Sequence, residues 1–162
     1  AAYLAICARA EGISLVLQIL LYPVTDSRSY LDGVSTFAYP SIDENKNSPL
    51  LTLETMQFFA RETLSGSETT LSASDWRLSP ILTEDLSNLA PAYIAVCELD
   101  PLRDEGIAYA NRLTSAGNTV TLSNWPGQVH LLMQLAPVTD DGRRLLEAVV
   151  SALKSAFAGE AL

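Results

Sequence analysis

The chain has 162 residues, a length typical of one domain, and its 48% hydrophobic and 18% charged residues exclude a disordered chain. Its formal net charge of -9 argues against nucleic acid as a partner and against docking on anionic membranes, because both attract a cationic face. Two cysteines and one histidine occur without metal-ligand spacing, so neither a zinc site nor a disulfide framework is expected. No apolar run reaches the ~18 residues of a bilayer-spanning helix and no signal peptide is visible, so we expect a cytoplasmic protein.

The first 25 residues predict a helix followed by a buried strand. Residues 1–10 are rich in alanine, and Gly12 ends that helical pattern. Nothing before Ala1 supplies a helix cap, so we expect the chain to begin inside a domain. Residues 15–22 are almost all apolar, which is typical of a parallel strand covered on both faces, and Pro23 ends the run.

The stretch that follows has a different composition and predicts an insertion. Residues 26–88 are richer in Ser, Thr, Asn and Asp, with one strong helical pattern at 51–64 and Thr52 as its N-cap. A connection of this length with its own helix is often a lid or binding element. We therefore expect residues 26–88 to form a cap over a core made of residues 1–25 and 89–162.

Regular alternation of strand and helix returns after the insertion. Residues 92–99 predict a strand, and Pro101 predicts an early position in the helix that follows. A short strand at 119–122 and a turn at Pro126-Gly127 come next, and apolar spacing over residues 145–157 predicts a final amphipathic helix. This order predicts an α/β domain with a mostly parallel sheet.

Asp100 and His130 are the candidate catalytic residues, because each follows a predicted parallel strand. Loops at the carboxyl ends of neighbouring parallel strands lie at one edge of the sheet, so the two side chains are expected to meet. Serine hydrolysis needs a nucleophile, a base and an orienting carboxylate, and the order Asp…His is the second half of an α/β-hydrolase triad. There are two alternatives. Asp100, which directly precedes Pro101, could serve only as the N-cap of the helix that follows, and His130 could be a structural residue. Asp104 and Glu105 are expected to complement the helix dipole rather than act as catalytic acids, with support of the acid loop as their further role.

Several segments resemble the hormone-sensitive-lipase-like esterases of the α/β-hydrolase fold, and they occur in the family's order along essentially the whole chain. They are the strand leading into the cap (19–26, ILLYPVTD), the return from the cap (78–82, LSPIL, and 89–92, LAPA), the acid motif (100–106, DPLRDEG) and the histidine loop (127–130, GQVH). The resemblance implies the C-terminal portion of an α/β-hydrolase with a cap insertion.

This resemblance also implies a chemistry. Asp100 would be the triad acid and His130 the general base of an enzyme that hydrolyses small-molecule carboxylic esters through an acyl-enzyme, without metal or organic cofactor. The family often pairs through its last strand and helix, which makes residues 119–122 and 145–157 the candidates for a homodimer. Four apolar residues are candidates either for the substrate pocket or for packing: Met56, Phe58, Phe59 and Trp125.

Two parts of the family's machinery are absent from the sequence. There is neither a Gly-x-Ser-x-Gly nucleophile elbow nor a His-Gly-Gly-Gly oxyanion loop. The resemblance places the elbow immediately before Ala1, in an upstream segment or a partner chain. Ser48 and Ser79 each precede a proline in a predicted loop, which is unlike an elbow. After His130 the family usually has Gly and an aromatic residue, whereas this chain has Leu131 and Leu132.

Three functions are therefore compatible with the sequence. The first is a carboxylic ester hydrolase to which this chain contributes the acid and the base. The second is a truncated, inactive fragment that acts as an interaction module through the apolar strand edge at residues 15–21. The third is another serine hydrolase of the same fold, such as a peptidase, because the fold alone does not determine the substrate.

Overall fold

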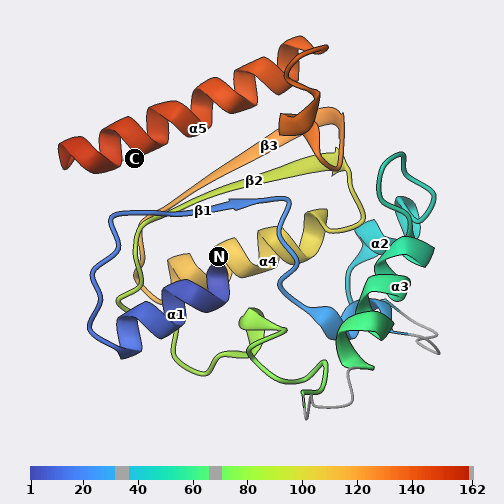
Figure 1. The fold of residues 1–162 in the computed structure, drawn as a ribbon, viewed down its shortest axis with the longest axis horizontal. Helices are drawn as coiled ribbons and strands as arrows, with labels where there is room; N and C mark the ends of the chain where they lie inside the picture. The colour runs from blue at the N-terminus through green and yellow to red at the C-terminus, as the bar shows by residue number, and fades with distance from the viewer. Residues whose placement is uncertain (32–36, 66–70, 161–162) are drawn as a thin grey trace.

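The computed structural model describes residues 1–31, 37–65 and 71–160. Its centre is a parallel sheet with the strand order β1-β2-β3 (Figure 1). The strands are β1 (Gln18–Leu21), β2 (Ala92–Leu99) and β3 (Val120–Val129). The register aligns Leu20 with Ile94 and Ile94 with Leu122, so the three strands end at the same edge of the sheet.

Helices cover both faces of this sheet, as the alternation of elements predicts. Helices α1 (Ala2–Ala10) and α4 (Arg103–Ser115) lie on one face, and α5 (Asp140–Ala158) lies on the other (Figure 1). Successive residues of β2 point to opposite faces, so Ile94 packs with α1 and α4 while Ala95 packs with α5. Both residues are fully buried, which explains why β2 is apolar from Ala92 to Cys97, before the exposed Glu98.

The strands differ in length from the predictions at two places. β1 has only four residues, and Leu15 and Val16, which were predicted to belong to it, are 39% and 49% exposed. β3 runs past the predicted end at residue 122, because Pro126-Gly127 forms an irregularity inside the strand instead of a turn that ends it. There, Glu98 alone of β2 faces residues 126–128 of β3, and the ladder resumes at Leu99 and Val129.

The helix ends follow local capping chemistry. The Thr139 hydroxyl accepts a hydrogen bond from Gly142 N and begins α5. α1 starts at Ala2, and its cap residue, Ala1, makes no side-chain hydrogen bond to the helix. Pro101 was predicted to lie early in α4, but the helix starts at Arg103 with Leu102 as its cap residue, and Pro101 lies in the turn before it.

The residues predicted as an insertion form short helices, which are η1 (Ser27–Tyr30), α2 (Pro40–Glu44), α3 (Leu53–Leu64) and η2 (Pro80–Leu82). Of these, η1, α2 and α3 lie beyond the carboxyl ends of the strands, and η2 packs on the face of the sheet that α1 and α4 cover (Figure 1). The Thr52 hydroxyl caps α3 by accepting from Thr55 N at 3.2 Å, as the sequence predicts. Ile42 and Met56 pack against Leu102 in a small core, which joins these helices to the start of α4.

Two further features of the surface bear on the predictions. Among the helices of the described residues, none combines the length and the apolarity that crossing a membrane requires. The outward face of α5 exposes a row of apolar side chains: Leu146, Val150, Leu153 and Phe157. These four residues belong to the range 145–157 that the sequence offers for a homodimer, whereas Leu145 and Val149 of that range are buried. The pairing itself stays a prediction.

Candidate active site

Asp100 lies in the first turn after β2, and its side chain is fully buried. One carboxylate oxygen, Oδ1, accepts a hydrogen bond from Leu102 N at 2.9 Å. The other, Oδ2, lies 2.8 Å from Nδ1 of His130. The N-cap role considered as an alternative is therefore replaced by a related one, because Asp100 stabilises the turn before the helix cap and still has an oxygen for the imidazole.

His130 follows the last residue of β3, and its side chain is 13% exposed. An ionised carboxylate only accepts hydrogen bonds, so Nδ1 carries a proton in its bond to Asp100 and Nε2 holds the free lone pair. This is the tautomer that a general base needs, since Nε2 is then able to take a proton. The structure thus brings together the two residues that the sequence singles out, from loops after neighbouring strands.

The His130 side chain lines a cavity of about 630 Å³ at the carboxyl edge of the sheet. Its walls come from the start of α1 (Ala1 and Ala2), the segment after β1 (Val24) and helix α3 (Met56 and Phe59). These contributions are mostly apolar, which is typical of a site for a small organic molecule.

The four apolar residues considered for a pocket separate into two groups. Met56 and Phe59 line the cavity. Phe58 is 49% exposed, and its ring centroid lies 5.6 Å from that of Phe59. Trp125 packs against the core between β2 and α5, so its contacts are those of a structural residue.

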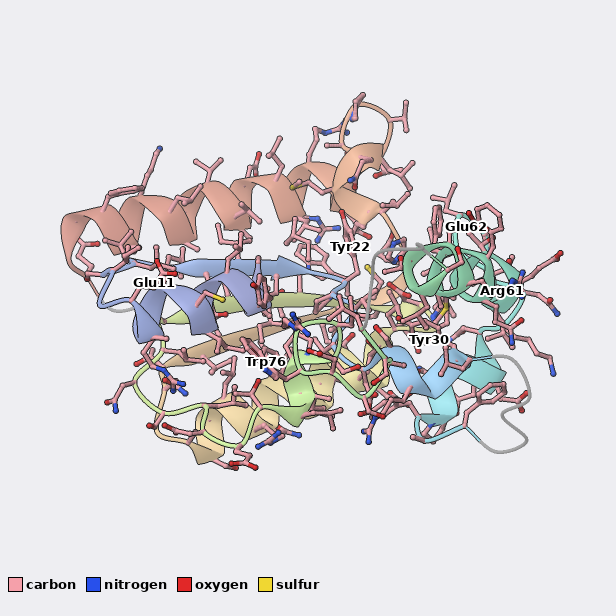
Figure 2. The ribbon with its side chains drawn as sticks, turned by 60° about the horizontal axis from the view of Figure 1, so that its bottom comes forward. Glu11, Tyr22, Tyr30, Arg61, Glu62 and Trp76 are labelled. Atoms are coloured by element: carbon pink, nitrogen blue, oxygen red, sulfur yellow. The ribbon has the colours of Figure 1, made fainter. Side chains whose placement is uncertain are left out.

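Tyr22 is a residue of the site that the sequence did not indicate. Its ring centroid lies 4.7 Å from that of His130 at an interplanar angle of 60°. Its hydroxyl donates to Oε1 of Gln134 at 2.5 Å, in the 3-10 helix η3 (Leu132–Leu135). Figure 2 shows Tyr22 at the end of β1, on the side of the sheet covered by α5. The usable signal was its position directly after β1, at the edge where Asp100 and His130 meet.

Glu105 has a role other than the predicted helix-dipole charge. Its side chain is fully buried, and Oε1 accepts hydrogen bonds from Thr25 N at 2.6 Å and Asp26 N at 3.2 Å. Burial, with the nearby charges of Asp26 and Asp100, raises the pKa of the Glu105 carboxyl to about 8 despite these hydrogen bonds. Glu105 therefore ties the start of α4 to the segment that leaves β1.

Asp104 also connects elements in addition to lying in the first turn of α4. Its Oδ2 accepts from Ser41 N at 2.8 Å, and its Oδ1 accepts from Nε of Arg103 at 2.7 Å. Burial opposes ionisation here, but these hydrogen bonds prevail and the pKa of the Asp104 carboxyl is lowered. Neither Asp104 nor Glu105 is among the residues that line the cavity.

The described residues contain no group of three or more His, Cys, Asp and Glu side chains able to hold a metal ion. Cys97 is buried in β2, where burial raises the pKa of its thiol to about 12 and keeps it protonated. Ser79 is buried and donates to the carbonyl of Ala73 at 2.6 Å, and Ser48 is bonded to the carbonyl of Leu99. These two serines have structural partners, in agreement with the view that neither is a nucleophile.

A parallel sheet covered by helices on both faces, with an acid and a histidine after neighbouring strands, defines the class of α/β hydrolases. A family profile described as alpha/beta hydrolase fold matches residues 1–134. The chain is 33% identical over 149 residues to ethyl acetate hydrolase of Pseudomonas putida, covering 92% of this chain and 43% of that protein. It is 35% identical over 150 residues to carboxylesterase NlhH of Mycobacterium tuberculosis, covering 90% of this chain and 43% of that protein.

Solved structures agree with these sequence comparisons. A hyperthermophilic esterase from Pyrobaculum calidifontis superposes with a TM-score of 0.81 at 32% identity, covering 96% of this chain and 48% of that one. The chain belongs to the hormone-sensitive-lipase-like family of α/β hydrolases. It spans less than half the length of the two curated relatives named above.

Proposed function

We propose that this chain supplies the acid and the base of a carboxylic ester hydrolase, with His130 as general base and Asp100 as its orienting carboxylate. The observation that carries the proposal is the 2.8 Å bond between Asp100 Oδ2 and His130 Nδ1 beside a largely apolar cavity. Two relatives are named ethyl acetate hydrolase and carboxylesterase, which supports an ester as the substrate class. The cavity lining favours a small ester with an apolar acyl group.

The nucleophile in this proposal is a serine that precedes Ala1, in an upstream segment of the same protein or in a partner chain. Ala1 and Ala2 line the cavity together with His130, so a residue just before α1 would lie beside the same cavity. The first turn of a helix also presents free backbone N–H groups, which favour the negative charge of an oxyanion. The exposed apolar residues Leu15 and Val16 support a further part of the protein packed beside β1.

The proposed reaction has two halves. His130 Nε2 takes the proton of the serine hydroxyl while the serine oxygen attacks the acyl carbon, and it then gives that proton to the departing alkoxide. A water molecule then attacks the acyl carbon of the acyl-enzyme and gives its proton to His130. His130 returns that proton to the serine oxygen as the carboxylic acid is released. Asp100 stays ionised throughout and stabilises the imidazolium that forms in both halves.

We also propose that residues 26–88 act as a cap and that residues 1–25 and 89–162 belong to the core. Met56 and Phe59 support this division, because they bring the side chains of α3 to the cavity that His130 lines. Acyl groups of different size would contact this helix. The cap would thus contribute to substrate selection, while the residues that follow the strands of the sheet would take part in the reaction.

The first prediction tests the base and the acid in the intact protein that contains this chain. His130→Ala and Asp100→Asn are each expected to lower kcat for p-nitrophenyl acetate by about 10²–10⁴-fold, because an unaided serine hydroxyl is a weak nucleophile. Asp43→Asn is the matched control, since its carboxylate is exposed and bonded to Lys46. Normal turnover in His130→Ala would contradict the proposal.

A second assay separates the hydrolase classes and the inactive-fragment alternative. The intact protein is expected to turn over short acyl esters and to leave peptide amides uncleaved under the same conditions. Faster cleavage of a peptide would favour the peptidase alternative. The absence of any hydrolysis, in protein shown to be folded, would favour the interaction module.

A further inference from the structure

The backbone of Tyr22 adopts a conformation that its side chain disfavours. Tyr22 has φ 40°, in the left-handed region that residues with a Cβ atom rarely occupy. Its N–H still donates to the carbonyl of Ala95 at 2.7 Å, continuing the bonding between β1 and β2. The chain therefore changes direction immediately after its last bond to the sheet, and surrounding contacts must hold it there.

Two of those contacts are made with His130 and with the segment that follows it. The Tyr22 ring packs against the imidazole with 4.7 Å between centroids, and the Tyr22 hydroxyl is bonded to Gln134, four residues after the histidine. Leu131, between them, has φ 63°, so the backbone directly after the histidine is also left-handed. Tyr22 is 8% exposed, and burial raises the pKa of its hydroxyl, which therefore stays protonated and donates to Gln134.

The bond to Asp100 restrains the imidazole at only one atom. A ring held by a single hydrogen bond at Nδ1 can still tilt about that bond and move Nε2 away from the nucleophile. A second ring packed at 60° limits this tilt, and the hydroxyl bond to Gln134 limits movement of the loop that carries the histidine. Small displacements of a catalytic group lower the rate strongly, since reaction needs near-contact geometry.

We propose that Tyr22 is a positioning residue, which holds the His130 imidazole in its bond with Asp100 through ring packing and through the hydroxyl bond to Gln134. The part of this inference that concerns rate rests on the proposed esterase function. The part that concerns the imidazole applies to the folded protein whether or not it hydrolyses esters.

The kinetic test uses the intact protein and separates the hydroxyl from the ring. Tyr22→Phe and Gln134→Leu each remove the hydroxyl bond, and each is expected to lower kcat about tenfold with KM nearly unchanged. The double variant is expected to be no worse than either single one, because both changes break the same bond. Tyr22→Leu also removes the ring and is expected to lower kcat further.

Tyr109→Phe is the matched control. Tyr109 is fully buried on α4, and its hydroxyl has no hydrogen-bond partner among the described residues. It belongs to the core on the other face of the sheet from Tyr22 and His130. The kcat of the Tyr109→Phe variant is expected to equal that of the unaltered protein. An equal loss in Tyr109→Phe, a loss confined to KM, or additive losses in the double variant would overturn the proposal.

A spectroscopic test makes the proposal independent of catalysis. The downfield NMR signal of the His130 Nδ1 proton, assigned by its loss in His130→Ala, reports the bond to Asp100. We expect it to be retained in Tyr109→Phe, weaker in Tyr22→Phe and lost to solvent exchange in Tyr22→Leu. If Tyr22→Leu does not fold, Tyr22→Phe and Gln134→Leu still test whether the hydroxyl bond holds the imidazole in place. An unchanged signal in folded Tyr22 variants overturns the proposal, whereas inactivity of the unaltered protein overturns only the esterase function.

Discussion

Glu105 illustrates how one buried side chain links the acid motif to the start of the proposed cap. Its Oε1 is bonded to the backbone N–H groups of Thr25 and Asp26, while Thr25 Oγ1 donates to the Glu105 carbonyl at 3.0 Å. Its second oxygen, Oε2, has no hydrogen-bond partner among the described residues. Ionisation is therefore unfavourable in the folded state, where the carboxylates of Asp26 and Asp100 add repulsion.

This arrangement predicts a pH dependence of stability. The pKa of Glu105 rises from its ordinary 4.5 to about 8 on folding, so the folded state binds more protons between these values. Its contribution to stability is present in full below about pH 4.5 and is lost as the pH rises through about 8. Glu105→Gln cannot ionise and is expected to remove this decline, which is on the order of 4 kcal/mol between pH 5 and 9.

Urea unfolding of the intact protein at several pH values measures this effect. Glu147→Gln makes the same change at an exposed position of α5 and is expected to leave the pH dependence intact. Parallel pH curves for Glu105→Gln and the unaltered protein would contradict the assignment of the raised pKa to Glu105.

Tyr22 and Glu105 also show why part of the site was not predictable from the sequence. Asp100 and His130 could be predicted, because each follows an apolar strand and the order of acid and base along the chain is that of an α/β-hydrolase triad. The partner of Tyr22 lies 112 residues away, and that of Glu105 lies 80 residues away on the backbone. A first-turn glutamate usually complements the helix dipole, and nothing local distinguishes a buried one.

At the scale of elements, the close approach of α4 to β2 depends on Gly106. A Cβ atom at this position would lie 2.8 Å from Val96 Cγ1, well inside the normal contact distance. Gly106 is buried, and Val96 on β2 is fully buried. The glycine thus permits the helix to lie close to the strand that ends in Asp100.

We predict that Gly106→Ala lowers the free energy of unfolding by about 1–3 kcal/mol, despite the better helix propensity of alanine. Asn111→Ala tests propensity alone, because this α4 residue is exposed, and it is expected to raise stability by about 0.5 kcal/mol. Chemical denaturation gives both values. A gain in stability from Gly106→Ala would show that the helix and strand can separate without cost.

The elements also differ in how well local patterns predicted them. β2 and α3 were recovered because a continuous apolar run and an N-cap threonine are local signals. β3 was underestimated because Pro126-Gly127 ordinarily ends a strand, and only pairing with β2 shows that the strand continues. The apolar residues before β1 suggested a longer strand, although they have no partner strand among the described residues.

At the scale of the whole molecule, the exposed apolar side chains beside β1 predict a further part of the protein. Val16 is 49% exposed although it lies in an apolar run. If upstream residues cover it, Val16→Lys buries a charge and is expected to destabilise the intact protein by about 2 kcal/mol or more. Val138→Lys, at a residue that is 76% exposed, is expected to have little effect.

Thermal or urea unfolding of the two variants distinguishes these cases. Equal and small effects would show that Val16 remains exposed in the intact protein. That result would weaken the proposal that upstream strands pack beside β1, and it would leave the apolar edge available to another chain.

The strand order has a consequence for how the molecule folds. β2 and β3 begin pairing at Ala92 and Val120, only 28 residues apart, whereas β1 pairs Gln18 with Ala92 across 74 residues. Closing the longer loop costs about 0.9 kcal/mol more in chain entropy, so the unit from β2 to β3 is expected to form first. The acid and the histidine would then meet before Tyr22 arrives with β1, and the restraint on the imidazole would be among the last contacts made.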